Sequence, residues 1–301
     1  QILARLEHAG IARLLDGGVA PDGRPYTVLE YVDGVSLLEY CNARKAPLHE
    51  RLQLFVQVCD AVAYAHRNLV IHRDLKPANT LVDAEGKVKL LDFGIAKLVD
   101  AAASNNADAT ATAAPYTADY AAPEQLSGEP VTTATDVYAL GVLLFELLTG
   151  ERPLRRSGLP STQVLALLDR EAPLPSRVVR GKNTAPVPAN ALAGDLDAII
   201  AKCLRRESAH RYDTVNALKL DILRHLAHEP VLAREGARLY VFGRLVRRYR
   251  WAAAAATALI VALAAGLAGT LWQARRAETQ ARTSKAVQEF VTDVFRANSS
   301  E

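Results

Sequence analysis

Two hydrophobic periods run along this chain, and each predicts a different kind of element. Apolar residues recur at helical spacing in "ERLQLFVQVCDAVAYAHRN" (residues 50–68), a pattern typical of an amphipathic α-helix. The segment "TTATDVYALGVLLFELLTG" (132–150) is almost wholly apolar. Its first threonines suit an N-cap and its last glycine suits a C-cap, so a buried helix is expected there. Two more helices are expected in 194–208 and 213–229.

Other parts of the chain favour short strands. "IARLLDGG" (11–18) and "PYTVLEYV" (25–32) flank a Pro-Asp-Gly turn, which predicts a β-hairpin. Three later segments are short aliphatic runs and are expected to be extended: 69–72, 80–83 and 87–92. A turn is expected at Glu85–Gly86.

The remaining segments have a different character. Residues 1–9, "QILARLEHA", are expected to be the tail of a helix. Residues 101–114 are small and polar without any period, and predict a mobile loop. Residues 171–194 are rich in proline and are also expected to be loop.

Composition narrows the class of protein. Half of the 301 residues are hydrophobic and 23% are charged, which excludes a disordered chain. The formal net charge of +3 gives no reason to expect a nucleic-acid partner. Cys41, Cys59 and Cys203 have no metal-like spacing and predict free thiols in a reducing compartment. The chain contains no methionine, so a segment before Gln1 is expected to be missing, and a signal peptide is neither asserted nor excluded.

The polar segment "HRDLKPAN" (72–79) and a second aspartate, Asp92, carry groups that suit phosphoryl transfer from ATP. Such a transfer needs a carboxylate near the acceptor hydroxyl, a cation on the moving phosphate and oxygen ligands for Mg²⁺. Asp74 suits the first role and Lys76 the second. Asn79 and Asp92 offer amide and carboxylate oxygens, the hard ligands that Mg²⁺ prefers. A purely structural loop is the alternative reading of these residues.

Five motifs, taken in order, make the chain resemble the protein kinases. "HRDLKPAN" and "DFG" (92–94) are similar to the catalytic and metal-binding loops of that family. "APE" (122–124), "DVYALG" (136–141) and Arg211 follow in the family's order. "DLKPAN" resembles the same segment of serine/threonine kinases rather than that of tyrosine kinases. The sequence around the motifs resembles the bacterial eukaryotic-like members of the family. A small-molecule phosphotransferase is disfavoured because such enzymes lack the APE and DVYALG elements.

The resemblance implies an α+β, two-lobed protein-kinase fold with a truncated β-rich N-lobe and a helical C-lobe, followed by one transmembrane helix. The parts are expected to be the remainder of the N-lobe with the hinge (1–32), the C-lobe (33–229), a basic juxtamembrane segment (230–250), the transmembrane helix (251–272) and the start of an extracytoplasmic segment (273–301).

The resemblance also implies a nucleotide site. Leu29 would be the gatekeeper beside the adenine, and backbone groups of Glu30 and Val32 would bond the base. Ser36 would lie near the ribose, and Leu81 would form the floor under the adenine ring. ATP and Mg²⁺ are therefore the expected ligands.

Supporting roles follow from the same resemblance. Thr117 would bond the catalytic aspartate and favour hydroxyl acceptors, so protein substrates with serine or threonine are expected. Asp136, in an apolar helix, would bond the backbone of the catalytic loop, because a buried carboxylate needs such donors. Glu124 would pair with Arg211.

Regulation is expected in the segment after "DFG". Arg73 precedes the catalytic aspartate, a feature that suggests control by phosphorylation of that segment. Thr110 and Thr112 are the candidate acceptors. The alternative is an Ala/Thr spacer without regulation. Thr80 stands where the family usually has an aliphatic residue, which puts the local packing in question.

The family pattern is incomplete at the start of the chain. No GxGxxG segment and no "VAIK"-like lysine precede the hinge, and the helix glutamate that pairs with that lysine is expected just before Gln1. These parts are missing together while the metal-binding residues are intact, which favours truncation over decay. We therefore expect a serine/threonine kinase that is weak or inactive as the chain stands. The alternative is a membrane-anchored pseudokinase that serves as a scaffold.

Residues 251–272 have no charge and a tryptophan at each end. At about 1.5 Å per residue they span about 33 Å, enough for a hydrocarbon core of about 30 Å. A buried helix is the alternative. The preceding arginines are expected to keep the kinase domain on the cytoplasmic side of a bacterial inner membrane: Arg244, Arg247, Arg248 and Arg250. The small pair Ala265 and Gly269 is compatible with a homodimer.

Overall fold

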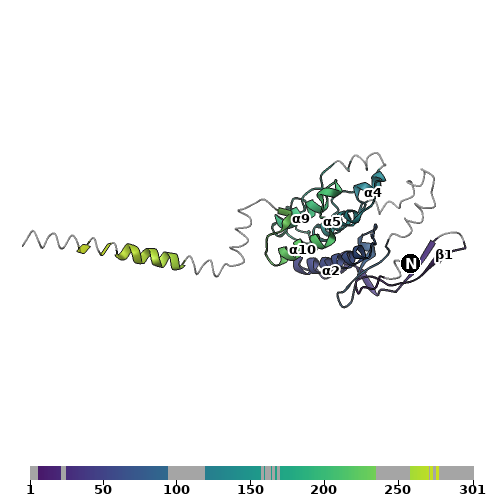
Figure 1. Cartoon of the computed structure of the whole chain (residues 1–301), viewed down its shortest axis with the longest axis horizontal. Coiled ribbons are helices and arrows are strands. Elements are labelled where there is room, and N and C mark those ends of the chain that lie inside the picture. The colour runs from purple at the N-terminus through teal and green to yellow at the C-terminus, as the bar shows by residue number, and fades with distance from the viewer. Residues whose placement is uncertain are drawn as a thin grey trace, which may run out of the picture. The chain divides into compact units, whose positions relative to one another are not determined.

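The computed structural model describes residues 6–21, 25–93, 119–156, 159, 164, 167, 170–234, 258–270, 272–273 and 276–277 (Figure 1). The chain divides into two compact units, Gln1–Arg238 and Leu239–Glu301. The first unit holds two small sheets and the helices that carry the hydrophobic core.

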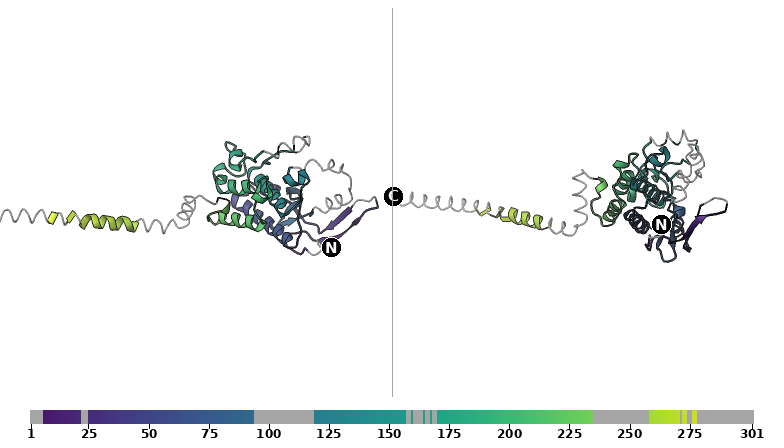
Figure 2. Two further views of the ribbon diagram at one scale, coloured as in Figure 1. Left: turned by 45° about the horizontal axis from the view of Figure 1, so that its top comes forward. Right: turned by 45° about the vertical axis from the view of Figure 1, so that its right-hand side comes forward.

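The hairpin expected near the start of the chain is confirmed. β1 (Leu14–Val19) pairs antiparallel with β2 (Pro25–Leu29), and Gly17 lies opposite Thr27. In both views of Figure 2 these two strands project from the helical body of the unit. Apolar side chains on the hairpin therefore stay exposed, among them Leu15.

A second sheet carries the middle of the first unit. β3 (Gly34–Ser36), β4 (Thr80–Asp83) and β5 (Val88–Leu90) lie in the order β3-β4-β5, and both pairs are antiparallel. The expected turn between β4 and β5 is confirmed, because Gly86 adopts φ 77°, in the left-handed region that favours glycine. The extended segments expected at 80–83 and 87–92 are thus found as β4 and β5.

Residues 69–72 were expected to be extended, and they form no strand. The Val70 N–H donates to the Ala65 carbonyl at 3.0 Å and closes the preceding helix. The His72 N–H donates to the Asp136 carboxylate at 2.8 Å. Both amides are therefore occupied by partners outside any sheet.

The helix tail expected in residues 1–9 is not found in the part that the structure describes, which begins at Leu6. Instead, the Gly10 N–H donates to His8 Nδ1 at 3.0 Å, and the Ile11 N–H donates to the His8 carbonyl at 3.0 Å. These bonds form a turn. Ile11 then makes a parallel bridge with Leu90 of β5.

The core is built around α5 (Thr133–Thr149), almost every residue of which is buried. It is flanked by α2 (Leu48–Arg67), α9 (Asp195–Cys203) and α10 (Val215–Leu226), and α10 also packs on α2 and on α9. All four helices were expected from the sequence. The caps of α5 are confirmed as well: the Thr132 hydroxyl accepts the Ala134 N–H at 3.3 Å, and the C-cap glycine adopts φ 75°.

Shorter elements complete the first unit: α1 (Leu37–Ala43), η2 (Pro77–Asn79), α4 (Pro123–Ser127), α7 (Pro175–Val178), α8 (Ala189–Leu192), η4 (Ser208–His210) and η5 (Leu232–Arg234). Helices α7 and α8 lie inside 171–194, which was expected to be loop throughout. The Ser176 N–H and hydroxyl donate to the buried Asp197 carboxylate at 2.9 and 2.6 Å, and so hold the first turn of α7.

The second unit is described mainly as a helix over residues 258–270. Within the residues that the structure describes, no helix combines the length and the apolar character needed to cross a membrane. Residues 251–257 and 271 of the expected span lie outside the described residues. The expected loop 101–114 also lies outside them.

Candidate active site

The loop that follows α2 is held by one buried carboxylate. Asp136, in the first turn of α5, is fully buried and accepts three hydrogen bonds. Its oxygens accept the His72 N–H at 2.8 Å and the Arg73 N–H at 2.9 Å. His66 Nε2, at the end of α2, lies 2.7 Å from Asp136 Oδ2. A buried carboxylate without such donors would be costly, so this arrangement fixes the loop backbone.

Asp74, Lys76 and Asn79 meet at the end of that loop. Lys76 Nζ lies 2.7 Å from Asp74 Oδ2, and the side-chain amide of Asn79 donates to the same oxygen at 3.0 Å and to the Asp74 carbonyl at 2.9 Å. Asn79 is buried, whereas 13% of the Asp74 side chain remains exposed. The cluster therefore presents one carboxylate, fixed by two neighbours, at the surface.

One backbone hydrogen bond ties this cluster to Leu91, the residue before Asp92. The Leu91 N–H donates to the Asn79 carbonyl at 2.9 Å. Asp92 itself is exposed and adopts φ 44°, a conformation that non-glycine residues rarely adopt and that is often found at functional sites. Gly94 lies outside the described residues.

Phe93 and His72 form the apolar support of the loop. The two rings pack with centroids 4.5 Å apart at 36°, and both side chains are buried. Burial lowers the pKa of His72, so its ring is neutral at pH 7. This agrees with a packing residue and gives no support to a general acid or base at this position.

Thr80, the departure from the family pattern, has a local partner. Its hydroxyl donates to the Lys76 carbonyl at 3.1 Å, and the side chain is fully buried. A buried hydroxyl needs such a partner, so threonine is accommodated at the start of β4 without disturbing the packing.

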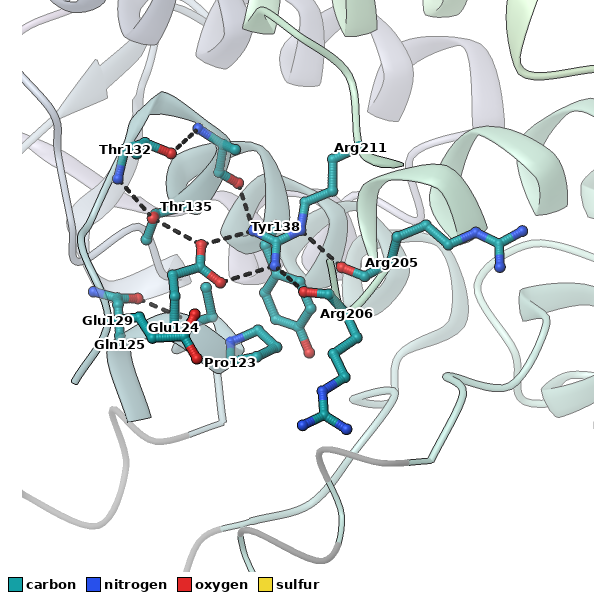
Figure 3. A network of polar contacts seen from close by, with 12 residues as sticks. Pro123, Glu124, Gln125, Glu129, Thr132, Thr135, Tyr138, Arg205, Arg206 and Arg211 are labelled. Atoms are coloured by element: carbon teal, nitrogen blue, oxygen red, sulfur yellow. Dashed lines mark hydrogen bonds and ion pairs between the residues drawn. The ribbon is translucent and has the colours of Figure 1, made fainter. Parts of the chain in front are cut away.

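Figure 3 shows a polar network that joins α4, the start of α5 and the segment after α9. Arg211 forms a forked pair with Glu124, with Nη1 2.7 Å from Oε1 and Nη2 2.8 Å from Oε2. The Thr135 hydroxyl also donates to Glu124 Oε1 at 2.8 Å. Burial disfavours the charged carboxylate, but the hydrogen bonds from Arg211 and Thr135 outweigh it and lower the pKa of Glu124. The pair expected from the sequence is therefore present in the structure.

The expected nucleotide residues lie at the ends of short strands. Leu29 ends β2, and Leu81, on β4, pairs in register with Ser36 on β3. The Ser36 hydroxyl accepts the Glu39 N–H at 3.3 Å, so it also caps α1. Thus Ser36 and Leu81 are brought together.

Glu30 and Val32 follow β2 directly. The Glu30 N–H donates to the Arg13 carbonyl at 2.9 Å, and the Glu30 carboxylate pairs with Lys89 of β5. This pair ties the segment after β2 to the second sheet. Lys89 was not expected from the sequence, because nothing in a β-strand pattern identifies the partner of a half-buried lysine.

Other expected residues cannot be placed. Thr110, Thr112 and Thr117 lie outside the described residues.

The Arg73 Nε atom is buried and has no hydrogen-bond partner among the residues that the structure describes.

Sequence reasoning missed two further contacts of the loop. His66 was treated only as part of an amphipathic helix, although it contacts Asp136. Gln125, next to Glu124, donates from its side-chain amide to the Arg73 carbonyl at 3.0 Å. The only available signal for His66 was a polar residue at the end of an apolar helix face, and for Gln125 there was none.

Comparison with known proteins places this geometry in a family. The protein kinase domain model matches residues 1–223. The chain is 36% identical over 234 residues to the serine/threonine-protein kinase PknB of Mycobacterium tuberculosis, covering 76% of this chain and 35% of that protein. It is 38% identical over 231 residues to PknB of Mycolicibacterium smegmatis, covering 74% of this chain and 34% of that protein. Serine/threonine-protein kinase PrkC of Bacillus subtilis is 35% identical over 224 residues, covering 74% of this chain and 32% of that protein.

The chain spans about a third of the length of these curated relatives. The family match, however, covers most of this chain and includes the loop, the Glu124–Arg211 pair and the helix that bears Asp136. This chain belongs to the protein kinase domain family.

Proposed function

We propose that this chain transfers the γ-phosphate of ATP to serine and threonine hydroxyls of proteins, with Asp74 as the base. The observation that carries the proposal is the convergence of Lys76 and Asn79 on the Asp74 carboxylate, at 2.7 and 3.0 Å. Asp74 accepts the proton of the hydroxyl while the hydroxyl oxygen bonds to the γ-phosphorus. The bond from that phosphorus to the bridging oxygen breaks, and ADP leaves.

The neighbours of Asp74 have separate tasks in this proposal. Lys76 places a positive charge next to the carboxylate, where it neutralises the phosphate that moves. Asn79 restrains Asp74 through two bonds from its amide nitrogen, which leaves the amide oxygen for another ligand. Asp136 fixes the loop that carries all three groups. The reacting groups of the site are therefore already close to their working positions. Such positioning is a main source of catalysis in phosphoryl transfer.

The oxygen ligands fit Mg²⁺. Asn79 contributes an amide oxygen and Asp92 a carboxylate, and both are hard ligands of the kind that Mg²⁺ prefers. When bound, the ion supplies positive charge against the phosphates of ATP. For the adenine, we propose Leu29, Glu30 and Val32 at the segment after β2. Ser36 and Leu81, paired in register, supply the ribose contact and the floor.

Regulation is proposed at Arg73. Its buried Nε has no partner among the described residues, and a guanidinium in that state favours an anion. We propose that a phosphate on Thr110 or Thr112 is that anion, and that Thr117 bonds Asp74. Mass spectrometry of the purified protein after incubation with Mg·ATP tests this: phosphate on neither threonine rules out the regulatory assignment.

The kinase proposal is tested with the Asp74→Asn variant. Phosphate transfer from γ-labelled ATP to a serine/threonine-rich protein acceptor is measured with the protein expressed from its complete reading frame. Asp74→Asn is expected to slow transfer about a hundredfold to ten-thousandfold, because it removes the base. Asp213→Asn, at an exposed position of the first unit, is the matched control and is expected to leave the rate unchanged. Equal rates for both variants would exclude Asp74 as the base.

Residues 1–301 by themselves are proposed to transfer phosphate slowly. They contain no GxGxxG segment and no "VAIK"-like lysine before the hinge, so half of the nucleotide clamp is absent from this polypeptide. The second candidate is a membrane-anchored pseudokinase scaffold. Sequencing the coding DNA upstream of the Gln1 codon separates the two. A reading frame that encodes both missing elements supports the enzyme, and a start codon close to Gln1 supports the scaffold.

We also propose that residues 251–272 anchor the protein in a bacterial inner membrane, with the first unit in the cytoplasm. The support is the 22-residue run without charge, its terminal tryptophans and the arginines before it. The fraction of protein that stays in carbonate-washed membranes tests this. Leu263→Arg, in the middle of the run, is expected to reduce that fraction several-fold, whereas Gln273→Arg, just beyond it, is not. A chain that carbonate releases completely would contradict the anchor.

A further inference from the structure

A basic hollow of about 650 Å³ lies beside α4 in the first unit. We call it the arginine hollow, after the charged residues that line it: Arg156, Arg170, Arg177, Arg205, Arg206, Glu171, Glu207 and His210. With histidine neutral, five arginines and two glutamates give this lining a formal charge of +3. The whole chain carries no more than that, so the hollow is a strong local concentration of positive charge.

The two glutamates do little to neutralise it. Glu171 is 92% exposed and lies 3.6 Å from Arg205, while Glu207 lies 2.7 Å from His210 with both side chains exposed. Exposed pairs of this kind contribute little and are screened by salt. Among the described residues, no acidic group lies within ion-pair distance of Arg170 or Arg177. Within the part of the chain that the structure describes, the positive charge of Arg170 and Arg177 therefore remains available to a ligand.

The type and the rigidity of the cations also matter. All the basic groups apart from His210 are arginines, whose planar guanidinium binds carboxylates through two parallel hydrogen bonds. Arg156 is buried and donates to the Ala121 carbonyl and to the Tyr138 hydroxyl, both at 2.7 Å. It therefore forms a fixed wall, while the exposed side chains of Arg170 and Arg177 can reorient toward a ligand.

The hollow is connected to the catalytic loop. Pro123 of α4 lines it, and two residues later Gln125 donates to the Arg73 carbonyl at 3.0 Å. On the other side, Arg211 donates to the carbonyls of Arg205 and Arg206 at 2.7 and 2.8 Å. Figure 3 shows the side chains of these two arginines extending away from the Glu124–Arg211 pair. The same buried pair thus fixes the backbone of the hollow and the helix that contacts the loop.

We propose that the arginine hollow binds a segment of the protein substrate with clustered aspartates or glutamates, and so holds that substrate next to the catalytic loop. The positive charge of the hollow, its fork-shaped donors and its link through α4 select this partner over a neutral one. The identity of this partner as a substrate rests on the proposed kinase function. The binding itself follows from the charge and the shape of the hollow.

The test measures binding without catalysis. The probe is a fluorescein-labelled peptide with six consecutive glutamates, and its Kd for the purified chain is measured by fluorescence anisotropy at two salt concentrations. A peptide with glutamines in their place is the neutral control. We expect the acidic peptide to bind at least about tenfold more tightly, with a difference that shrinks as salt rises.

Charge reversal locates the site. The double variant Arg170→Glu with Arg177→Glu is expected to weaken binding of the acidic peptide about tenfold or more. Arg180→Glu is the matched control, because Arg180 is exposed just after α7 and does not line the hollow; its Kd is expected to stay within about twofold. All three arginines are exposed, so both proteins should keep the parent melting temperature.

Two results would overturn the proposal. One is an equal loss of affinity in the double variant and in Arg180→Glu, which would mean that only net charge matters. The other is binding to phosphatidylserine vesicles, but not to the peptide, that depends on Arg170 and Arg177, which would assign the hollow to a membrane surface. Both results are binding measurements, so neither of them depends on phosphate transfer. A chain that binds the peptide but shows no effect of Asp74→Asn would sink the proposed function and leave this inference standing.

Discussion

Arg211 and Glu124, 87 residues apart in sequence, are joined by two parallel hydrogen bonds of 2.7 and 2.8 Å. Arg211 also donates to the carbonyls of Ala134, Arg205 and Arg206, so a single guanidinium joins α4, the start of α5 and the turn after α9. Its side chain is fully buried. The pair therefore acts as a cross-brace between segments that the chain places far apart.

Replacing Arg211 by lysine should destabilise the first unit strongly. One ammonium cannot reproduce the fork to Glu124 and the three carbonyl bonds, so buried acceptors lose their donors. We expect a loss of about 3–5 kcal/mol in the free energy of unfolding, the usual cost of breaking a buried pair. Urea unfolding followed by circular dichroism measures it. Arg205→Lys, an exposed neighbour, should change the value by less than about 0.5 kcal/mol, and an equal loss in both would refute the brace.

The same pair predicts acid sensitivity. The folded pKa of Glu124 is lowered below its usual value of 4.5, so the folded state binds its proton less readily than the unfolded state. The stability that this group contributes is present above about pH 4.5, and it is lost as pH falls through the folded pKa. Glu124→Gln should therefore cost stability at pH 7, and its difference from the parent should shrink below pH 4.5. Melting temperatures between pH 3 and pH 7 measure this, and a constant difference would contradict it.

The sequence was sufficient to predict those parts of the fold and of the candidate site that depend on local spacing. The hairpin was predicted from its turn residues, α2 from its hydrophobic period and α5 from its apolar run and cap residues. The cluster around Asp74 lies within eight consecutive residues, 72–79. The failures share another cause. Residues 69–72 have the composition of a strand, but their amides bond to the preceding helix and to Asp136, which is 64 residues away from His72. No local pattern contains that partner.

Partners that come from distant elements were missed for the same reason. His66 approaches Asp136 only because α2 and α5 pack together, and Gln125 approaches Arg73 only because α4 lies beside the loop. The short helices α7 and α8 depend on a tertiary contact as well, since Asp197 of α9 holds the first turn of α7. Local propensity is weak in such segments, and packing decides their structure.

Removing the third donor to Asp136 should loosen the catalytic loop. Among the residues that the structure describes, His66→Ala leaves the Asp136 carboxylate with two backbone donors, and we expect a loss of about 1–3 kcal/mol in stability. Hydrogen exchange of the peptide that contains His72 and Arg73 should accelerate, because those amides bond to the same carboxylate. His66→Gln keeps a donor and should restore part of the protection. Unchanged exchange in His66→Ala would show that the backbone bonds alone hold the loop.

Gly141 of α5 should not tolerate a larger residue, because the helix packs against α9 at that point. A Cβ placed on Gly141 would lie 2.5 Å from the Cβ of Cys203, closer than real side chains approach. Alanine usually stabilises a helix relative to glycine by about 1 kcal/mol, but here the clash should dominate. We expect Gly141→Ala to cost about 1–3 kcal/mol in urea unfolding, through overpacking.

A second substitution distinguishes overpacking from other causes. Cys203→Ala keeps the Cβ that clashes and should not rescue Gly141→Ala, whereas Cys203→Gly removes it. In a double-mutant cycle, Gly141→Ala with Cys203→Gly should show a favourable coupling of about 1 kcal/mol or more, and the cycle with Cys203→Ala should show much less. Equal coupling in the two cycles would mean that the thiol, and not the Cβ, sets the distance between α5 and α9. Both residues are buried, so neither effect can arise from solvent-exposed charge.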